Sequence, residues 1–233
     1  IRYSECDCEE IIKIESIIDY FQDIAISDSH DVGCGGKQLM FDKHQAWVLS
    51  SWQVEISRYP EAQEYVKIVT VPYEFKGFTG LRNCGILDSN GEFLVKANSI
   101  WVLMDMDKKR PTKVSADMIN AYKIGEKFDM DYGFRRIELP REGEEVKAPI
   151  TVERHHLDSL GHVNNGQYVR LAVNVMEEEF AGKIIRPGKL RVEYKMQALP
   201  GDALIPHLWK TENSTIVSFM NEEEKIYATV EIS

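Results

Sequence analysis

The 233-residue chain lacks several features that would assign a protein to a class at once. It has no apolar run near the roughly 20 residues of a membrane-spanning helix, and no basic-then-apolar signal segment opens it. Its four cysteines form no CxxC pair, which argues against a zinc site and against a disulfide framework. We therefore expect a cytoplasmic protein with no metal and no membrane insertion. The chain does not begin with methionine, so we expect that Ile1 is not the native start.

Positive charge is also scarce, because 28 Lys and Arg residues face 38 Asp and Glu residues, for a net charge of −10. A nucleic-acid-binding protein needs a basic surface to contact phosphates, so this charge argues against a general nucleic-acid binder. The chain is 43% hydrophobic and 28% charged, as expected of a globular protein with a core. Its length suits one large domain or two small fused ones.

Apolar residues recur at helical spacing in two places. The first stripe follows i, i+3, i+4, i+7 and i+8 at Ile17, Tyr20, Phe21, Ile24 and Ala25. The second stripe repeats these intervals at Tyr168, Leu171, Ala172, Val175 and Met176. The offset is 151 residues (168 − 17 = 151), and it also relates Asp7 to Asp158 in the polar segment before each helix (158 − 7 = 151). The chain is therefore interpreted as one structural unit written twice.

Strand-like patterns follow each predicted helix. In the first half they cover 46–56, 65–72, 80–87 and 93–104, with a hairpin turn at 89–91, and in the second half 190–196 and 226–232. An apolar helix needs a surface to pack against, so we predict an α+β fold in which a curved antiparallel sheet wraps each helix. The charged and unpatterned stretch 108–143 is predicted to link the halves, with a short helix near 115–124.

The loop before the second helix combines an unusual set of polar residues. Asp158, Gly161 and His162 are followed by Asn164 and Asn165, where the helical pattern begins. Free N–H groups and the positive end of a helix dipole at such a position can polarise a carbonyl group. Asp and Asn are also preferred helix caps, so Asp158 and Asn164 have a purely structural alternative.

The HVNN segment at 162–165 belongs to an ordered series of motifs along nearly the whole chain. The others are 3–7 (YSECD), 19–23 (DYFQD), 47–49 (WVL), 58–60 (RYP), 101–105 (WVLMD), 110–111 (RP), 192–195 (VEYK) and 201–202 (GD). In this order the chain resembles the acyl-ACP thioesterases of bacteria and plants. The resemblance implies a tandem (double) hotdog fold, with a long central helix in each unit. It further implies that the thioester of a fatty acyl-acyl carrier protein is hydrolysed to free fatty acid by activated water, without a metal or organic cofactor.

The resemblance also assigns site residues. Asp158 and His162 match the family's catalytic Asp and His, whereas Leu160 stands where the family has Asn and Gln197 where it has Glu. Plant members have Cys at the next position, where this chain has Ala198, so a cysteine nucleophile is excluded there.

Water is therefore the predicted nucleophile. Asp158 is the candidate base, and His162 would orient the reacting groups or protonate the leaving thiol. Gln197 can hold a water molecule but cannot take its proton. Asn164 completes the candidate catalytic set, and Asn165 is a candidate for substrate binding at the helix start.

The first unit carries no equivalent set. At the offset of 151, His162 corresponds to Ile11 and Asn165 to Ile14, and only Asp7 keeps the chemistry of its counterpart. We therefore predict an N-terminal acyl-binding hotdog at 1–110, a linker at 111–145 and a C-terminal catalytic hotdog at 146–233. Candidates for lining the acyl site are Ile11, Ile14, Trp47 and Trp52, although ordinary core is the more common role for any single one of them.

The predicted partner is an acyl carrier protein, which is acidic like this chain, so docking would need a local basic patch. Candidates lie around the linker at Lys108, Lys109, Arg110, Arg135 and Arg136. Two alternatives stay open: an acyl-CoA thioesterase on the same fold, and a non-catalytic acyl-thioester-binding protein, which Leu160 and Gln197 favour. A hotdog dehydratase has less support. A monomer and a homodimer both fit the sequence.

Overall fold

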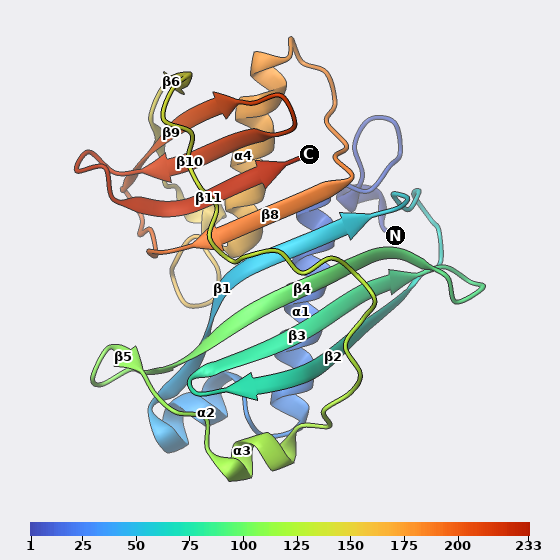
Figure 1. The fold of residues 1–233 in the computed structure, drawn as a ribbon, viewed down its shortest axis with the longest axis vertical. Helices are drawn as coiled ribbons and strands as arrows, with labels where there is room; N and C mark the ends of the chain where they lie inside the picture. The colour runs from blue at the N-terminus through green and yellow to red at the C-terminus, as the bar shows by residue number, and fades with distance from the viewer. The chain divides into compact units, whose positions relative to one another are not determined.

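The computed structural model describes all residues from Ile1 to Ser233, and the chain forms two compact units. Unit 1 comprises Ile1–Ile12 and Asp19–Gly133, and unit 2 comprises Lys13–Ile18 and Phe134–Ser233. Each unit combines a long helix with an antiparallel sheet (Figure 1), which confirms the predicted α+β class. The predicted linker, 111–145, is divided between the units after Gly133.

Unit 1 is built from a four-stranded sheet with the order β2-β3-β4-β1. The strands are β1 (Gln45–Ile56), β2 (Lys67–Lys76), β3 (Thr79–Leu87) and β4 (Phe93–Asp105), and the short β5 (Arg110–Pro111) pairs with β4. The helical elements are the 3-10 turn Tyr3–Glu5, α1 (Ile14–Asp31), whose start up to Ile18 belongs to unit 2, α2 (Gly36–Lys43) and α3 (Ala116–Ala121). The sequence predicted all four long strands, but β2 continues past Pro72, and α2 was not predicted.

Alternation along the strands of unit 1 separates an inner face from an outer face. On β3, the Arg82 side chain reaches Asp28 of α1, and the Cys84 thiol lies 3.8 Å from the Phe21 carbonyl oxygen. On β1, the ring of Trp52 packs against that of Phe21, with 5.9 Å between the centroids. The inner face therefore packs against α1, and this helix supplies the apolar stripe predicted from its spacing.

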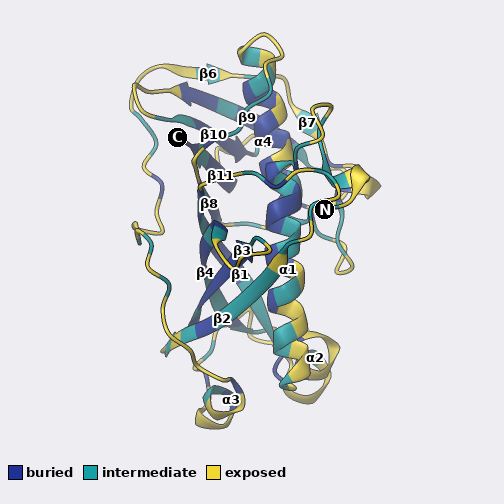
Figure 2. Ribbon diagram, turned by 90° about the vertical axis from the view of Figure 1, so that its right-hand side faces the viewer, coloured by how far each residue is buried: buried dark blue, intermediate teal, exposed yellow.

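Unit 2 has a sheet with the order β8-β11-β10-β9-β6. Its strands are β6 (Glu144–Val146), β7 (Ile150–Thr151), which also pairs with β9, β8 (Lys189–Tyr194), β9 (Ala203–Lys210), β10 (Thr215–Met220) and β11 (Ile226–Ile232). The helix α4 (Asn165–Glu179) contacts β9, β10 and β11, and its buried stripe is visible in Figure 2. All five residues of the predicted second stripe are buried. The strands β9 and β10 were not predicted.

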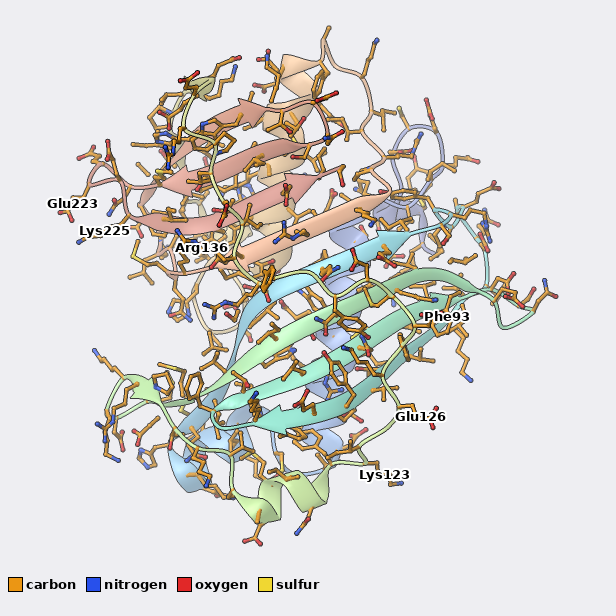
Figure 3. The ribbon with its side chains drawn as sticks, in the orientation of Figure 1. Phe93, Lys123, Glu126, Arg136, Glu223 and Lys225 are labelled. Atoms are coloured by element: carbon orange, nitrogen blue, oxygen red, sulfur yellow. The ribbon has the colours of Figure 1, made fainter.

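Residues 123–133, here called the first strap, run along the outer face of the unit 1 sheet. Asn83 of β3 accepts a hydrogen bond from the Phe128 N–H at 3.0 Å. Lys96 and Gln53 donate to the carbonyl oxygens of residues 129 and 131, at 2.7 and 2.6 Å. Lys123 and Glu126 point away from the sheet (Figure 3). Side chains of the strap contribute as well, because the ring of Phe128 packs against that of Phe93 with 4.9 Å between the centroids.

Residues 134–142, the second strap, cover part of the unit 2 sheet. Ile137 is buried in a cluster with Trp209, Ile216 and Met220. Its N–H donates to a carboxylate oxygen of Glu193 at 3.3 Å. Arg136, labelled in Figure 3, holds its carbonyl oxygen 3.0 Å from the Arg191 guanidinium. This part of the predicted linker is therefore an ordered part of unit 2.

Candidate functional site

The loop between the 3-10 turn Arg154–His156 and α4 forms a closed, hydrogen-bonded turn. The Asp158 N–H donates to the His162 carbonyl oxygen at 2.8 Å. In the other direction, Asp158 Oδ1 accepts the N–H groups of Leu160 and His162 at 2.8 and 3.3 Å. Gly161 has a φ of +80°, a left-handed conformation that glycine adopts without strain. The Asp158 carboxylate therefore shapes the loop that presents His162.

Contacts on both sides fix this loop within unit 2. The Val163 N–H donates to the Ala198 carbonyl oxygen at 3.1 Å, and the Asn164 N–H donates to the His156 carbonyl oxygen at 2.8 Å. The Ala198 N–H in turn donates to the Tyr168 hydroxyl of α4 at 3.2 Å. The loop is consequently tied both to α4 and to the segment that follows β8.

His162 is half-buried, and its Nδ1 atom is inaccessible to solvent without any hydrogen-bond partner in the protein. The carboxylate of Asp158 reaches the His162 backbone and not its ring. Leaving a buried polar atom unpaired costs about 1–3 kcal/mol, so each such atom calls for an explanation. Of the four predicted catalytic residues, His162 is the one with a buried side-chain atom that lacks a partner.

Asn164 caps α4, because its Oδ1 accepts the Gly166 N–H at 2.8 Å. Its carbonyl oxygen accepts the Gln167 N–H at 2.9 Å. The structural alternative considered for Asn164 is therefore confirmed, while Asp158 stabilises the loop rather than the helix start. These bonds occupy two of the N–H groups expected to polarise a carbonyl. The Asn164 side-chain amide nitrogen keeps its donor capacity.

Gln197 and Leu160, the two departures from the family pattern, are both exposed. Gln197 lies beyond the end of β8, one residue before the buried Ala198. Leu160 is 71% exposed, which is unusual for a large apolar side chain in the loop that presents His162. The catalytic roles predicted for Asp158, His162, Asn164 and Gln197 stay predictions.

Unit 1 contains a second copy of the loop with the same hydrogen bonds. Asp7 Oδ1 accepts the N–H groups of Glu9 and Ile11 at 2.8 and 3.2 Å, and the Asp7 N–H donates to the Ile11 carbonyl oxygen at 2.8 Å. Glu10, at the position of Gly161, also has a positive φ of 63°. The helices begin at Ile14 and Asn165, again 151 residues apart (165 − 14 = 151).

The comparison of the two loops separates structural from functional residues. An Asp forms the turn in both, so this carboxylate has a structural reason to be present whether or not it reacts. Only the second loop carries a histidine, because Ile11 occupies the equivalent position in the first. The sequence indicated the duplicated Asp but not its loop-forming role, which depends on backbone N–H directions.

The residues predicted to line an acyl site lie in different surroundings. Ile11 is half-buried and bridges to Glu61, whereas Ile14, in the part of α1 that belongs to unit 2, is 3% exposed. Trp52 is 1% exposed, and its Nε1 has no hydrogen-bond partner. Trp47 packs instead with Phe75 in a separate cluster. The structure therefore does not bring Trp47 and Trp52 together.

Other classes of site have little support in the fold. No group of three His, Cys, Asp or Glu side chains is arranged to hold a metal ion. None of the four cysteines forms a disulfide. No helix has both the length and the hydropathy needed to span a membrane.

Comparison with protein families gives a match over each unit. Residues 1–122 match the family model of the acyl-ACP thioesterase N-terminal domain, and residues 140–232 match that of the acyl-ACP thioesterase C-terminal domain. The chain is 26% identical over 181 residues to the chloroplastic palmitoyl-acyl carrier protein thioesterase of Arabidopsis thaliana, covering 72% of this chain and 44% of that protein. It is 25% identical over 195 residues to the chloroplastic oleoyl-acyl carrier protein thioesterase 1 of the same plant, covering 77% and 54%. The chain thus spans about half the length of these relatives.

Solved structures share the fold over the whole chain. An acyl-ACP thioesterase from Bacteroides thetaiotaomicron superimposes with a TM-score of 0.88 at 19% identity, covering 99% of this chain and 93% of that one. A 12:0-ACP thioesterase from Umbellularia californica superimposes with a TM-score of 0.83 at 17% identity, covering 100% and 94%. The tandem hotdog architecture expected from the motifs is thereby confirmed.

Proposed function

The chain belongs to the acyl-ACP thioesterase family, and we propose that it hydrolyses the thioester of a fatty acyl-acyl carrier protein to a free fatty acid and the carrier protein. The observation that carries this proposal is the difference between the two equivalent loops. Only the loop of unit 2 presents an imidazole, and its buried Nδ1 has no partner within the protein. A thioester and the water that attacks it supply the polar atoms that such a group binds.

The proposed chemistry assigns one task to each group. A water molecule attacks the thioester carbonyl carbon and transfers a proton to Asp158 Oδ2, since Oδ1 is used by the loop. The Asn164 amide N–H and the positive end of α4 stabilise the developing oxyanion, while the bond to Gly166 holds the amide in place. The carbon–sulfur bond then breaks, and His162 donates a proton to the departing thiolate. The proton that Asp158 took from the water then passes to His162, so both groups end the cycle as they began it. Asn165 remains a candidate for substrate contact.

A second candidate, a non-catalytic acyl-thioester-binding protein, is favoured by Gln197. An amide holds water but accepts no proton, so one carboxylate of the family pattern is missing. This alternative predicts acyl-thioester binding without thiol release. An acyl-CoA thioesterase is separated from the main proposal by competing the two carriers in one assay.

The decisive experiment measures free-thiol release from a panel of acyl-acyl carrier proteins. We expect wild-type turnover, and we expect His162→Ala to lower kcat/KM by about 100-fold or more, because general acid–base groups contribute about that factor. Asp7→Asn is the matched control for Asp158→Asn, because both Asp side chains hold the same turn. Asp158→Asn should abolish turnover while Asp7→Asn retains it. Equal loss in both variants would show that only the loop fold matters. Absence of wild-type turnover would leave the binding-protein alternative.

We further propose that unit 1 receives the acyl chain, since its inner face carries the apolar residues of α1 and Trp52 but no counterpart of His162. The candidate basic residues for carrier docking fall in both units, with Lys108, Lys109 and Arg110 in unit 1 and Arg135 and Arg136 in unit 2. A cytoplasmic location is supported by the absence of disulfides. A monomer and a homodimer both remain open, and sedimentation would distinguish them.

A further inference from the structure

Unit 1 contains a part-buried ion pair, with a buried arginine, that the proposed chemistry does not use. Arg82 of β3 places its Nη2 atom 2.6 Å from Asp28 Oδ2 of α1, and the two side chains are 6% and 34% exposed. The other guanidinium nitrogen, Nη1, donates to Thr70 Oγ1 at 2.8 Å. The guanidinium carbon also lies 5.7 Å from the centroid of the Tyr122 ring. Arg82 is therefore held on several sides by unit 1 itself.

On one side of this ion pair the inner face of unit 1 is apolar. Along β3, Arg82 is followed by Cys84 and Ile86 at alternate positions, and both have no exposed surface. Burial raises the pKa of the Cys84 thiol to about 11, so this group is neutral. Along α1, Asp28 is preceded on the buried side by Ala25 and Phe21. The buried apolar residues of β3 and of α1 therefore both end where Arg82 meets Asp28.

On the other side lies a separate apolar cluster near α2 and α3. Its buried members are Cys34, Leu39, Leu103, Val114, Met118 and Tyr122, and Trp47 and Phe75 pack against them. Tyr122 is the member that faces the Arg82 guanidinium. The ion pair consequently separates the apolar region of Phe21 and Trp52 from the region of Trp47.

We propose that the Arg82–Asp28 ion pair is the end of the acyl-binding region and sets the longest acyl chain that the protein accepts. This inference rests on the proposed function, because it requires unit 1 to take up the acyl chain. Within unit 1, Phe21 precedes Asp28 on α1 by seven residues (28 − 21 = 7). At the 1.5 Å rise per residue of a helix this is about 10 Å, so a chain lying along this face from Phe21 ends at the ion pair.

The energetic reason is the contrast between burying methylene groups and breaking a buried ion pair. Each methylene that leaves water strengthens binding roughly fourfold. Removing one partner from a fully buried ion pair weakens a structure by a factor on the order of hundreds to thousands, and the loss is smaller here because the Asp28 side chain is 34% exposed. A chain too long for the apolar region therefore gains less from its extra methylenes than it loses by displacing the pair.

The test measures the chain-length limit directly. Non-hydrolysable acyl-pantetheine thioethers of increasing chain length are titrated into wild type and into Arg82→Met/Asp28→Leu, which removes both charges at similar volume. In wild type, affinity should rise roughly fourfold per methylene and then stop rising. In the double variant the rise should continue for two or more further methylenes. The same limit in both proteins would overturn the proposal.

Two further variants keep the test informative. Arg191→Met breaks an ion pair with Glu231 in unit 2, so it tests whether lost stability alone shifts the limit, and we expect no shift. Asp28→Asn keeps the size and the hydrogen-bond acceptor of the aspartate if the double variant does not fold. Because a neutral acceptor holds Arg82 less strongly, affinity for chains just beyond the limit should rise about threefold to tenfold. An unchanged limit in Asp28→Asn, when the double variant does not fold, would overturn the proposal.

Hydrolysis of the acyl-acyl carrier protein panel by the same variants distinguishes the two proposals. Binding with the expected limit but without thiol release would support the role of the ion pair and reject the thioesterase. Thiol release in which every variant keeps the wild-type chain-length limit would support the thioesterase and reject the role of the ion pair. Failure of every acyl chain to bind would overturn both.

Discussion

At the scale of single residues, comparison of the two copies of the loop separates the side chains that stabilise the fold from the one that has no structural partner. The Asp carboxylate is hydrogen-bonded to backbone N–H groups in both copies. Asn164 is engaged in capping α4. His162 differs, because its Nδ1 atom is buried without a partner. A substitution at His162 should therefore affect chemistry without disturbing the fold.

The first prediction concerns the stability of a His162 variant. His162→Phe removes the unpaired nitrogen and keeps a ring, so the free energy of unfolding should stay within about 1 kcal/mol of wild type or rise. Chemical denaturation measures it, alongside kcat/KM, which should fall at least 100-fold. A loss of 3 kcal/mol or more would show that the imidazole has a structural role.

The second prediction concerns Gln197. Gln197→Glu supplies a proton acceptor where the family pattern has one, so kcat for an acyl-acyl carrier protein should rise by about tenfold. Gln197→Ala is the control, because it removes the side chain without adding a base. An unchanged kcat in Gln197→Glu, with an active wild type, would exclude position 197 from the proton transfer.

At the scale of elements, the straps hold polar groups of the outer sheet faces that would otherwise lack partners. Asn83 has no exposed surface and accepts the Phe128 N–H and the Tyr132 hydroxyl, both at 3.0 Å, while its own amide donates to the Ala97 carbonyl oxygen. A single buried amide thus joins β3, β4 and the first strap.

The third prediction follows from this arrangement. Asn83→Leu leaves the Phe128 N–H unpaired in a part-buried position, so unit 1 should lose about 2–4 kcal/mol of stability. Urea unfolding measures this loss, and limited proteolysis should cut within 123–133. Lys96→Met, which removes one exposed bond to the strap, should cost less than about 1 kcal/mol. Equal losses in both variants would contradict the central role of Asn83.

The fourth prediction concerns the end of α4. The ammonium groups of Lys147 and Lys210 lower the pKa of Glu179 from 4.5 to about 2. Because the folded-state pKa is below the unfolded one, this contribution to stability is complete above pH 4.5 and is lost as the pH falls toward 2. Glu179→Gln should therefore lower stability at pH 7 and flatten its decline in acid, as thermal melts would show. An unchanged pH profile would contradict the coupling.

At the scale of the whole molecule, all four cysteines lie in unit 1, so their reactivity reports on that unit alone. Cys8 is exposed, whereas Cys34 and Cys84 are buried. Burial also raises the pKa of the Cys84 thiol to about 11, which lowers its thiolate fraction at neutral pH.

The fifth prediction uses this difference. A thiol reagent at pH 8 should modify Cys8 quickly, while Cys34 and Cys84 should react only when unit 1 opens, at least about 1000-fold more slowly. Mass spectrometry after timed labelling measures the three rates. Fast modification of Cys84 in the folded protein would contradict the packing of β3 against α1.

The sequence by itself determined the duplicated α+β plan, the two helical stripes, most long strands and the position of the HVNN loop. Hydrophobic periodicity is a local property, and the offset of 151 residues is a repeat along the chain. Both can therefore be recognised without knowing which segments contact each other. The sequence did not predict β9 and β10, although half of the residues of β9 and nearly all of those of β10 are buried.

Only the tertiary structure decided the contacts between residues far apart in the chain. It ordered the predicted linker as two straps, and it paired Arg82 with Asp28 across 54 residues. It also showed that His162 has an unpaired buried nitrogen while Asp158 holds the loop. These facts depend on packing and on backbone N–H directions, which no local pattern in the sequence encodes.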